Sequence, residues 1–145
     1  MIFRTALQKA DLESSFNRPD RPFFASGACH ILAHAFLDTV PSNGWKTILI
    51  LPQPGFRGSH VFASNKKYAF DYHGFTPVSR FQEHYFNKMK RWYPGWSADT
   101  LELDISPISS EFCSLYGHRL PQDFYKDPRP RAYAYLKRFD LPVDV

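Results

Sequence analysis

Apolar side chains recur at helical spacing in three parts of the chain and alternate with polar side chains in several others. Over residues 28–40, apolar positions return every three to four residues, which predicts a helix with Cys29 in its first turn. Ser26 is a residue type that commonly caps a helix, and the breaker sequence at 41–44 ends the pattern. We therefore expect this helix to begin close to a cysteine.

Strand-like patterns follow this helix. Residues 46–51 form a run of β-branched and other apolar side chains, which is typical of a buried strand. Residues 59–64 and 68–73 alternate, and the Asn65-Lys66 pair between them predicts a hairpin turn. This part of the chain is therefore expected to form antiparallel sheet.

The remaining sequence predicts more helix and one further strand. Residues 77–92 have a helical pattern, and its inner side consists of Phe81, Tyr85, Met89 and Trp92. We also expect Gly74 and Pro77 to close the sheet, a half-buried strand over 100–106, a turn-rich loop at 17–22, and a final helix over 131–138. A helix, then antiparallel strands, then further helices predict an α+β fold.

Length and composition fit one globular domain over residues 1–145, with 43% hydrophobic and 22% charged residues. The net charge of +4 comes from scattered basic residues with one cluster at Lys88, Lys90 and Arg91, whereas nucleic-acid binders usually concentrate them on one face. No segment approaches the roughly 20 apolar residues of a membrane span. We therefore expect neither nucleic acid nor a membrane as a partner.

Cysteine usage and the N-terminal sequence bear on the cellular compartment. Cys29 and Cys113 are the two cysteines, too few for a disulfide framework. Residues 1–15 lack the uninterrupted apolar core of a signal peptide. We expect a protein of the cytoplasm, or an effector exported without a signal peptide. Cys113 has no helix-start setting, so we expect it in the core.

The predicted position of Cys29 suits a nucleophile. A thiolate, not a thiol, attacks a carbonyl, and the positive end of a helix dipole stabilises that anion. The unpaired N–H groups of the first helical turn also suit the oxyanion that forms on the substrate. Gly27 and Ala28 leave room for a substrate to approach the sulfur.

A hairpin closed by Asn65-Lys66 places His60 directly opposite Asp71. Opposed residues of an antiparallel pair project to the same side, about 5 Å apart, so the carboxylate holds one imidazole nitrogen and the other serves the thiol. A symmetric four-residue loop keeps this pairing, whereas a three-residue loop sends the two side chains to opposite faces. His73 projects from the same face as Asp71 and is a reserve candidate for the imidazole.

These segments resemble parts of a known superfamily of cysteine enzymes. The sequence Ser-Gly-Ala-Cys-His at 26–30 is similar to the nucleophile turn of papain-like enzymes, where small residues precede a cysteine that opens a helix. Residues 60–63 and 68–71 resemble the His and Asp strands of the transglutaminase-like branch, which keeps the order Cys, His, Asp. The resemblance covers residues 25–75. It implies a Cys-bearing helix packed on a small antiparallel sheet, with additional C-terminal helices.

The same resemblance implies the activity and the site. It implies catalytic roles for Cys29, His60 and Asp71, thioester chemistry without a cofactor, and a protein or peptide substrate attacked at an amide or a glutamine side chain. Papain-type proteases carry an oxyanion glutamine shortly before the cysteine; residues 22–25 contain none, and Gln53 is the substitute candidate. The expected enzyme is a peptidase, a glutamine deamidase or a transglutaminase, and its small size suggests a toxin or effector.

Two other functions compete with this interpretation. His30 and His34 stand four residues apart on one helix face, a spacing that suits zinc, with Cys29, Asp38 or His73 as further ligands. Their segment lacks the glutamate of the metalloprotease signature. The third possibility is a binding module on the same fold without turnover, which would contact nucleic acid through residues 88–91.

Overall fold

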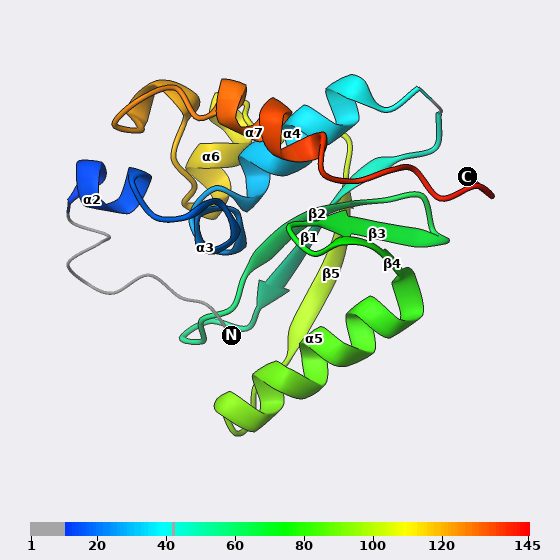
Figure 1. Ribbon diagram of the computed structural model, residues 1–145. Helices are drawn as coiled ribbons and strands as arrows, with labels where there is room; N and C mark the ends of the chain where they lie inside the picture. The colour runs from blue at the N-terminus through cyan, green and yellow to red at the C-terminus, as the bar shows by residue number, and fades with distance from the viewer. Residues whose placement is uncertain (1–10, 42) are drawn as a thin grey trace.

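An antiparallel sheet of five strands lies at the centre of the protein in the computed structural model, which describes residues 11–41 and 43–145 (Figure 1). The strand order is β4-β3-β2-β1-β5, so β1, β2 and β3 are interior strands and β4 and β5 form the edges. The strands are β1 (Lys46–Pro52), β2 (His60–Ser64), β3 (Tyr68–Asp71), β4 (Gly74–Pro77) and β5 (Ala98–Leu103).

Helices cover both faces of this sheet. In Figure 1, α5 lies on one side of the strands, and α4 and α7 lie together on the other. The helices are α2 (Leu12–Phe16), α3 (Asp20–Ala25), α4 (Cys29–Thr39), α5 (Val78–Trp92), α6 (Ser110–Tyr116) and α7 (Arg129–Leu136), with a 3₁₀ turn at Pro121–Asp123. The described residues therefore form an α+β fold, as the order of the sequence patterns predicts.

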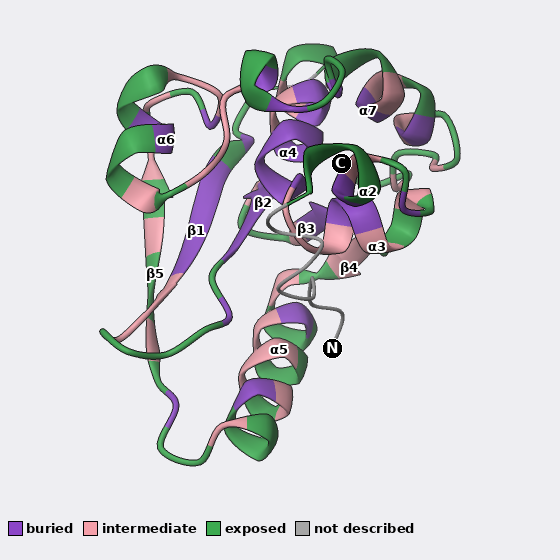
Figure 2. Cartoon of the chain, turned by 90° about the vertical axis from the view of Figure 1, so that its left-hand side faces the viewer, coloured by how far each residue is buried: buried purple, intermediate pink, exposed green. Residues whose placement is uncertain are grey.

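The helix α4 is the buried centre of one side. It packs on β2 and on α7, and Figure 2 shows it as mostly buried surface. Ile31 and Ala35 are fully inaccessible, and Phe36 stacks on Phe70 of β3 with ring centroids 4.4 Å apart. The packing of these apolar side chains fixes the helix over the middle of the sheet.

The sheet separates two apolar cores. On β1, Leu49 belongs to a cluster that includes Cys29 of α4, whereas Ile48 and Ile50 belong to the cluster under α5. This alternation follows from the two-residue period of a strand. Met89 of α5 is fully buried in the second cluster, so α5 is a docked helix and not a surface appendage.

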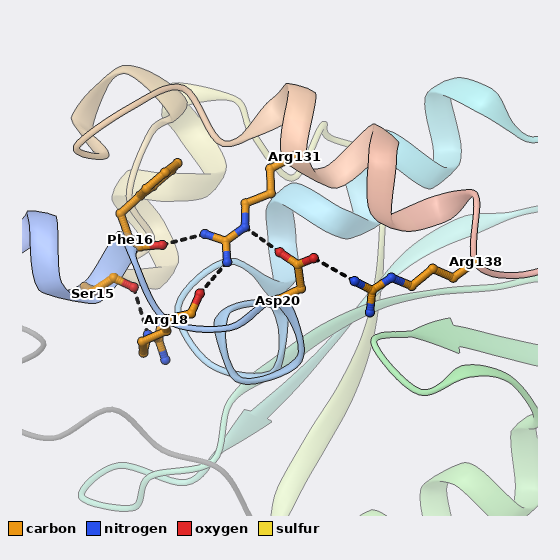
Figure 3. A network of polar contacts seen from close by, with 6 residues as sticks. All are labelled: Ser15, Phe16, Arg18, Asp20, Arg131 and Arg138. Carbon is orange, nitrogen blue, oxygen red and sulfur yellow. Dashed lines mark hydrogen bonds and ion pairs between the residues drawn. The ribbon is translucent and has the colours of Figure 1, made fainter.

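A polar network joins the N-terminal helices to α7 (Figure 3). The Arg131 guanidinium donates to the Asp20 carboxylate at 2.6 Å and also to the backbone carbonyls of Phe16 and Arg18. Arg138 donates to the other oxygen of Asp20 at 2.9 Å. Arg131 of α7 and Arg138, which follows that helix, therefore hold the segment that leads into α4.

Several local expectations are wrong. The expected loop at 17–22 overlaps a helix, because residues 20–25 form α3. Gly74–Pro77 forms a fourth strand, whereas Gly74 and Pro77 were expected to close the sheet. Gly74 has φ +93, and a Cβ there would lie 2.7 Å from the Phe139 ring, so only glycine fits. Trp92, expected on the inner side of α5, is 56% exposed.

Ser26 is not the N-cap of α4, because it ends α3 as its C-cap. Ala28 occupies the N-cap position and supplies no side-chain hydrogen bond to the helix. The remaining element bounds differ from the expected ones by one to three residues: the final strand is Ala98–Leu103 and the final helix is Arg129–Leu136.

Candidate functional site

Cys29 is the first residue of α4. The chain reverses direction just before it, at Gly27, whose φ of +108 is a conformation that glycine adopts without steric cost. The N–H of a residue at the first helical position has no acceptor within its own helix, and the Ala28 cap adds none from a side chain. The Cys29 sulfur therefore lies at the positive end of the helix, and 6% of the residue remains exposed.

His60 opens β2 at a point where the neighbouring strand β3 has already ended. The observed register pairs Ala63 with Phe70 and Ser64 with Ala69, so Asp71 lies opposite Phe62 and not opposite His60. The expected pairing of His60 with Asp71 is thus wrong by two residues. Because the slip is even, both side chains stay on the same face of the sheet.

The slip has a clear local cause in the turn. The Asn65 side chain accepts hydrogen bonds from the backbone N–H groups of Lys67 and Tyr68, at 3.0 and 2.7 Å. Asn65 therefore starts an Asx-type turn instead of sitting at the turn's centre, and Lys66 takes a left-handed φ of +75. Diagonal neighbours on one face are still within reach of long side chains.

The structure brings Cys29, His60 and Asp71 together. Nε2 of His60 lies 2.9 Å from Oδ2 of Asp71, and both side chains are almost fully buried. Cys29 lies close enough to the His60 ring to help raise the pKa of the imidazole. Asp71 occupies Nε2, which leaves Nδ1 as the ring nitrogen available to the sulfur.

The ionisation of the pair follows from these contacts. Burial lowers the pKa of His60, but hydrogen bonds and charge from Asp71 and Cys29 raise it, and the result is about 10. Burial raises the pKa of Asp71, but hydrogen bonds from His60 and His73 lower it to about 2. Both directions favour an imidazolium beside a carboxylate, and an imidazolium next to a sulfur stabilises a thiolate.

Three further residues surround the pair. The Tyr85 ring lies parallel to that of His60, with centroids 5.5 Å apart, and its hydroxyl donates to the Gly58 carbonyl at 2.6 Å. The backbone N–H of His73, the reserve imidazole, donates to Oδ1 of Asp71 at 2.9 Å. The Tyr72 ring meets His60 edge-on at 6.3 Å. These contacts fix the ring of His60 from several sides.

Tyr85 was expected only to pack in the core. Its sequence signal, an aromatic residue four positions after Phe81 on the inner helix face, is the same for a core residue and for one that supports a site. Burial, and then charge from Cys29, raise the pKa of the Tyr85 phenol, which therefore stays protonated.

Gln53 has a structural role in this fold. Its side-chain amide donates to the Gly95 carbonyl at 2.8 Å and accepts from the Ser97 backbone N–H at 2.7 Å. Both ends of the amide are thus used to join the end of β1 to the start of β5. Cys113 lies in the core as expected, and burial raises the pKa of its thiol.

The structure does not group His30 with His34 as the expected zinc ligands. His30 is fully buried, whereas His34 is half-buried one turn later. The group with metal-ligand geometry consists of Cys29, His30 and His118, whose ligand atoms lie within 4.8 Å of one another. His30 Nε2 also lies 2.7 Å from the Arg119 carbonyl, a contact typical of an oriented metal-binding imidazole. His118 comes from the loop after α6, so sequence spacing gave no signal for it.

Comparisons with protein-family models, with curated proteins and with solved structures give no match for this chain. Among residues 11–41 and 43–145, no helix has both the length and the apolar character needed to span a bilayer. The site is therefore interpreted from its own geometry.

Proposed function

We propose that this protein is a cysteine-dependent acyl-transfer enzyme that acts on amide bonds. Cys29 is the nucleophile, His60 is the general acid and base, and Asp71 orients the imidazole. The observation that carries the proposal is the buried 2.9 Å contact between His60 and Asp71, with Cys29 close to the same ring at a helix start. This three-part arrangement is recognised by geometry and roles rather than by sequence position.

The proposed reaction begins when His60 Nδ1 holds the proton of the Cys29 thiol. The thiolate adds to the amide carbonyl carbon, and negative charge moves onto the carbonyl oxygen, where the Cys29 backbone N–H is a candidate donor. The intermediate collapses as the C–N bond breaks, and the leaving nitrogen takes the proton from His60. A thioester with Cys29 remains.

A second nucleophile releases the acyl group. His60 accepts a proton from water or from an amine, the oxygen or nitrogen attacks the thioester, and Cys29 leaves as the thiolate. Water acting on a peptide acyl group completes proteolysis, water acting on a glutamyl group completes deamidation, and an amine completes transamidation. The proposed function includes all three outcomes, and the papain-like or transglutaminase-like relationship is part of this proposal.

Thiol alkylation tests the nucleophile directly. We expect iodoacetamide to modify Cys29 at pH 6–7, where an ordinary thiol is mostly protonated, and His60→Gln to slow that reaction about 10- to 100-fold. Mass spectrometry after digestion assigns the label to Cys29 or Cys113. Ammonia release from glutamine peptides and incorporation of a fluorescent amine then separate hydrolysis from transamidation.

Cys113→Ala is the matched control, because it removes the other buried free thiol, whose sulfur contacts the backbone carbonyl of Pro107. It should leave the rate at Cys29 unchanged. Alkylation of Cys29 with the pH dependence of a free thiol, unaffected by His60→Gln, would count decisively against the proposal.

A second candidate function uses the same sulfur as a zinc ligand. The group of Cys29, His30 and His118, of which the first two are buried, favours it, because three protein ligands with an open fourth position are typical of a catalytic zinc site. Purified protein that contains one zinc per chain, lost in His118→Ala, would support it. The acyl-transfer proposal instead expects full thiol reactivity in the presence of a chelator.

A further inference from the structure

A cavity of about 250 Å³ lies between α5 and the turn that joins β3 to β4. Three of its lining residues, Arg80, His84 and Lys88, are spaced four apart along α5. Residues four apart stack on one side of a helix. One wall of the cavity is therefore a row of basic and imidazole side chains.

The rest of the cavity consists of aromatic surface and of one carboxylate that already has hydrogen-bond partners. Phe81 and Tyr85 line it from α5, and Tyr72 lines it from the turn. Asp71 also contributes to the lining, but its two oxygens contact His60 and the His73 backbone at 2.9 Å each. The negative charge of Asp71 is thus already paired with His60. It does not balance the positive charges of Arg80 and Lys88 in the cavity wall.

Neither Arg80 nor Lys88 forms an ion pair with a carboxylate in residues 11–41 and 43–145. Arg80 and Lys88 lie about two turns apart on the same side of α5. An anionic group between these side chains would accept charge-assisted hydrogen bonds from both.

We propose that this cavity binds an acidic residue of a polypeptide substrate. Its methylene groups would pack on Phe81 and Tyr85, and its carboxylate would lie between Arg80 and Lys88. The volume is below the usual range for drug-sized ligand pockets, and it suits a single side chain. The inference rests on the proposed acyl-transfer function, because it names the substrate class of that site.

The cavity adjoins the proposed catalytic residues through shared walls. Asp71 lines the cavity and hydrogen-bonds His60, and Tyr85 lines the cavity and stacks on the His60 ring. A substrate side chain held there lies beside the His60 pair. The proposal therefore places the amide that Cys29 attacks in a neighbouring residue of the substrate, since consecutive residues are only about 3.8 Å apart.

Peptide binding to the Cys29→Ala protein tests this inference without turnover. The probes are the capped hexapeptides Ala-Ala-Glu-Gln-Ala-Ala and Ala-Ala-Gln-Gln-Ala-Ala, measured by isothermal titration calorimetry at low salt. We expect the Glu peptide to bind about tenfold more tightly, because two charge-assisted hydrogen bonds distinguish it. The double variant Arg80→Gln, Lys88→Gln should remove that preference.

The matched control is Lys90→Gln, Arg91→Gln, which removes the same charge from exposed positions of the same helix outside the cavity. It should retain the preference for the Glu peptide. Equal binding of the two peptides, or an equal loss of preference in the control variant, would overturn the inference.

Alkylation of Cys29 keeps the two proposals distinguishable. If Cys29 of the wild-type protein reacts with iodoacetamide in a His60-dependent way while the Cys29→Ala protein shows no preference for the Glu peptide, the acidic-substrate inference fails and the acyl-transfer proposal stands. If the preference is present while Cys29 behaves as a free thiol, the acyl-transfer proposal fails, and the cavity remains a carboxylate-binding site without the catalytic role.

Discussion

At the scale of single residues, the His60–Asp71 pair is expected to contribute both to the stability of the fold and to the chemistry of the Cys29 thiol. Its members are 3% and 4% exposed at their side chains, so both charges are taken out of water and each depends on the other. Removing one partner of a buried pair leaves an uncompensated charge. The same pair holds the imidazole that faces Cys29, so a single substitution is expected to affect both folding and thiol chemistry.

Asp71→Asn should lower the free energy of unfolding by about 3–5 kcal/mol, because it breaks a buried ion pair. It should also slow alkylation of Cys29 at neutral pH, since the imidazolium loses its counter-charge. Urea unfolding and iodoacetamide kinetics on the same preparation measure the two effects. Asp144→Asn removes an exposed carboxylate that pairs with Lys67 and should change neither; similar losses in both variants would contradict the prediction.

The pair should also make stability depend on pH. The folded-state pKa of His60 lies above the ordinary value of 6.5, so its contribution is complete below pH 6.5 and is lost as the pH rises through about 10. The folded-state pKa of Asp71 lies below 3.8, so its contribution is complete above that pH and is lost as the pH falls through about 2. The contribution of the pair is therefore greatest between pH 3.8 and 6.5.

Unfolding free energies of wild type and His60→Gln, compared at pH 6 and pH 10, check this dependence. The charged or titratable groups that face His60 are Asp71, Cys29, Tyr72 and Tyr85. The difference between the two proteins should shrink at the higher pH. A difference that stays constant or grows would show that protonated His60 does not stabilise the fold.

At the scale of elements, the start of α4 decides where the sulfur lies. Gly27, with its φ of +108, sets the direction in which the chain begins the helix. An L side chain in a left-handed conformation costs about 1–2 kcal/mol. The backbone either bears that strain or rotates, and rotation would displace Cys29 from His60.

Gly27→Ala is therefore expected to destabilise the protein by about 1–2 kcal/mol and to slow alkylation of Cys29. Gly55→Ala is the matched control. Its φ is +90 and an added Cβ meets no atom within 4 Å, so it imposes a comparable strain in a loop away from α4. Both variants should lose stability in thermal unfolding, but only Gly27→Ala should lose thiol reactivity. Equal rates at Cys29 in the two variants would exclude this role for the helix start.

Element-scale patterns predicted the helix that carries Cys29 and the strands that carry His60 and Asp71. Apolar periodicity was sufficient there because buried faces repeat regularly along one element. The exact register was not predictable, since Asn65 is compatible both with the centre of a turn and with the start of an Asx turn. The prediction placed both side chains on one face, and an error of two residues left that outcome intact.

Features that depend on contacts distant in sequence were missed. The helix at 20–25 contains Pro22 and follows Pro19, so its local sequence predicts a loop. Its acidic residue Asp20 is held by Arg131 of α7 and by Arg138, which follows that helix. His118 joins Cys29 and His30 only through the packing of α6 and its following loop. Residue spacing along the chain cannot predict such contacts between distant segments.

At the scale of the whole molecule, Arg131 of α7 holds the segment that leads to Cys29 from more than 100 residues away. Arg131 binds Asp20 and two backbone carbonyls, and its guanidinium lies 4.1 Å from the centre of the Phe23 ring. The segment that it holds runs through α3 directly into Gly27. Loss of this one side chain should therefore loosen the whole approach to α4.

Arg131→Gln should lower the free energy of unfolding by about 2–3 kcal/mol, because it removes several hydrogen bonds made by a charged, partly buried group. Amide hydrogen exchange should increase in residues 12–25 before it increases in the sheet. Arg129→Gln removes an exposed arginine of the same helix that pairs with Asp127 nearby, and it should leave exchange in 12–25 unchanged. An identical exchange pattern in both variants would contradict the proposed coupling.

The two cores on opposite faces of the sheet also distribute the three tryptophans conveniently for spectroscopy. Trp45 packs in the core beneath α4, Trp96 packs in the core beneath α5, and Trp92 lies mostly in solvent. A protein that retains only Trp45 or only Trp96 has one intrinsic fluorophore in one layer. Its emission then follows the melting of that layer, so the order in which the two halves come apart becomes visible without an added dye.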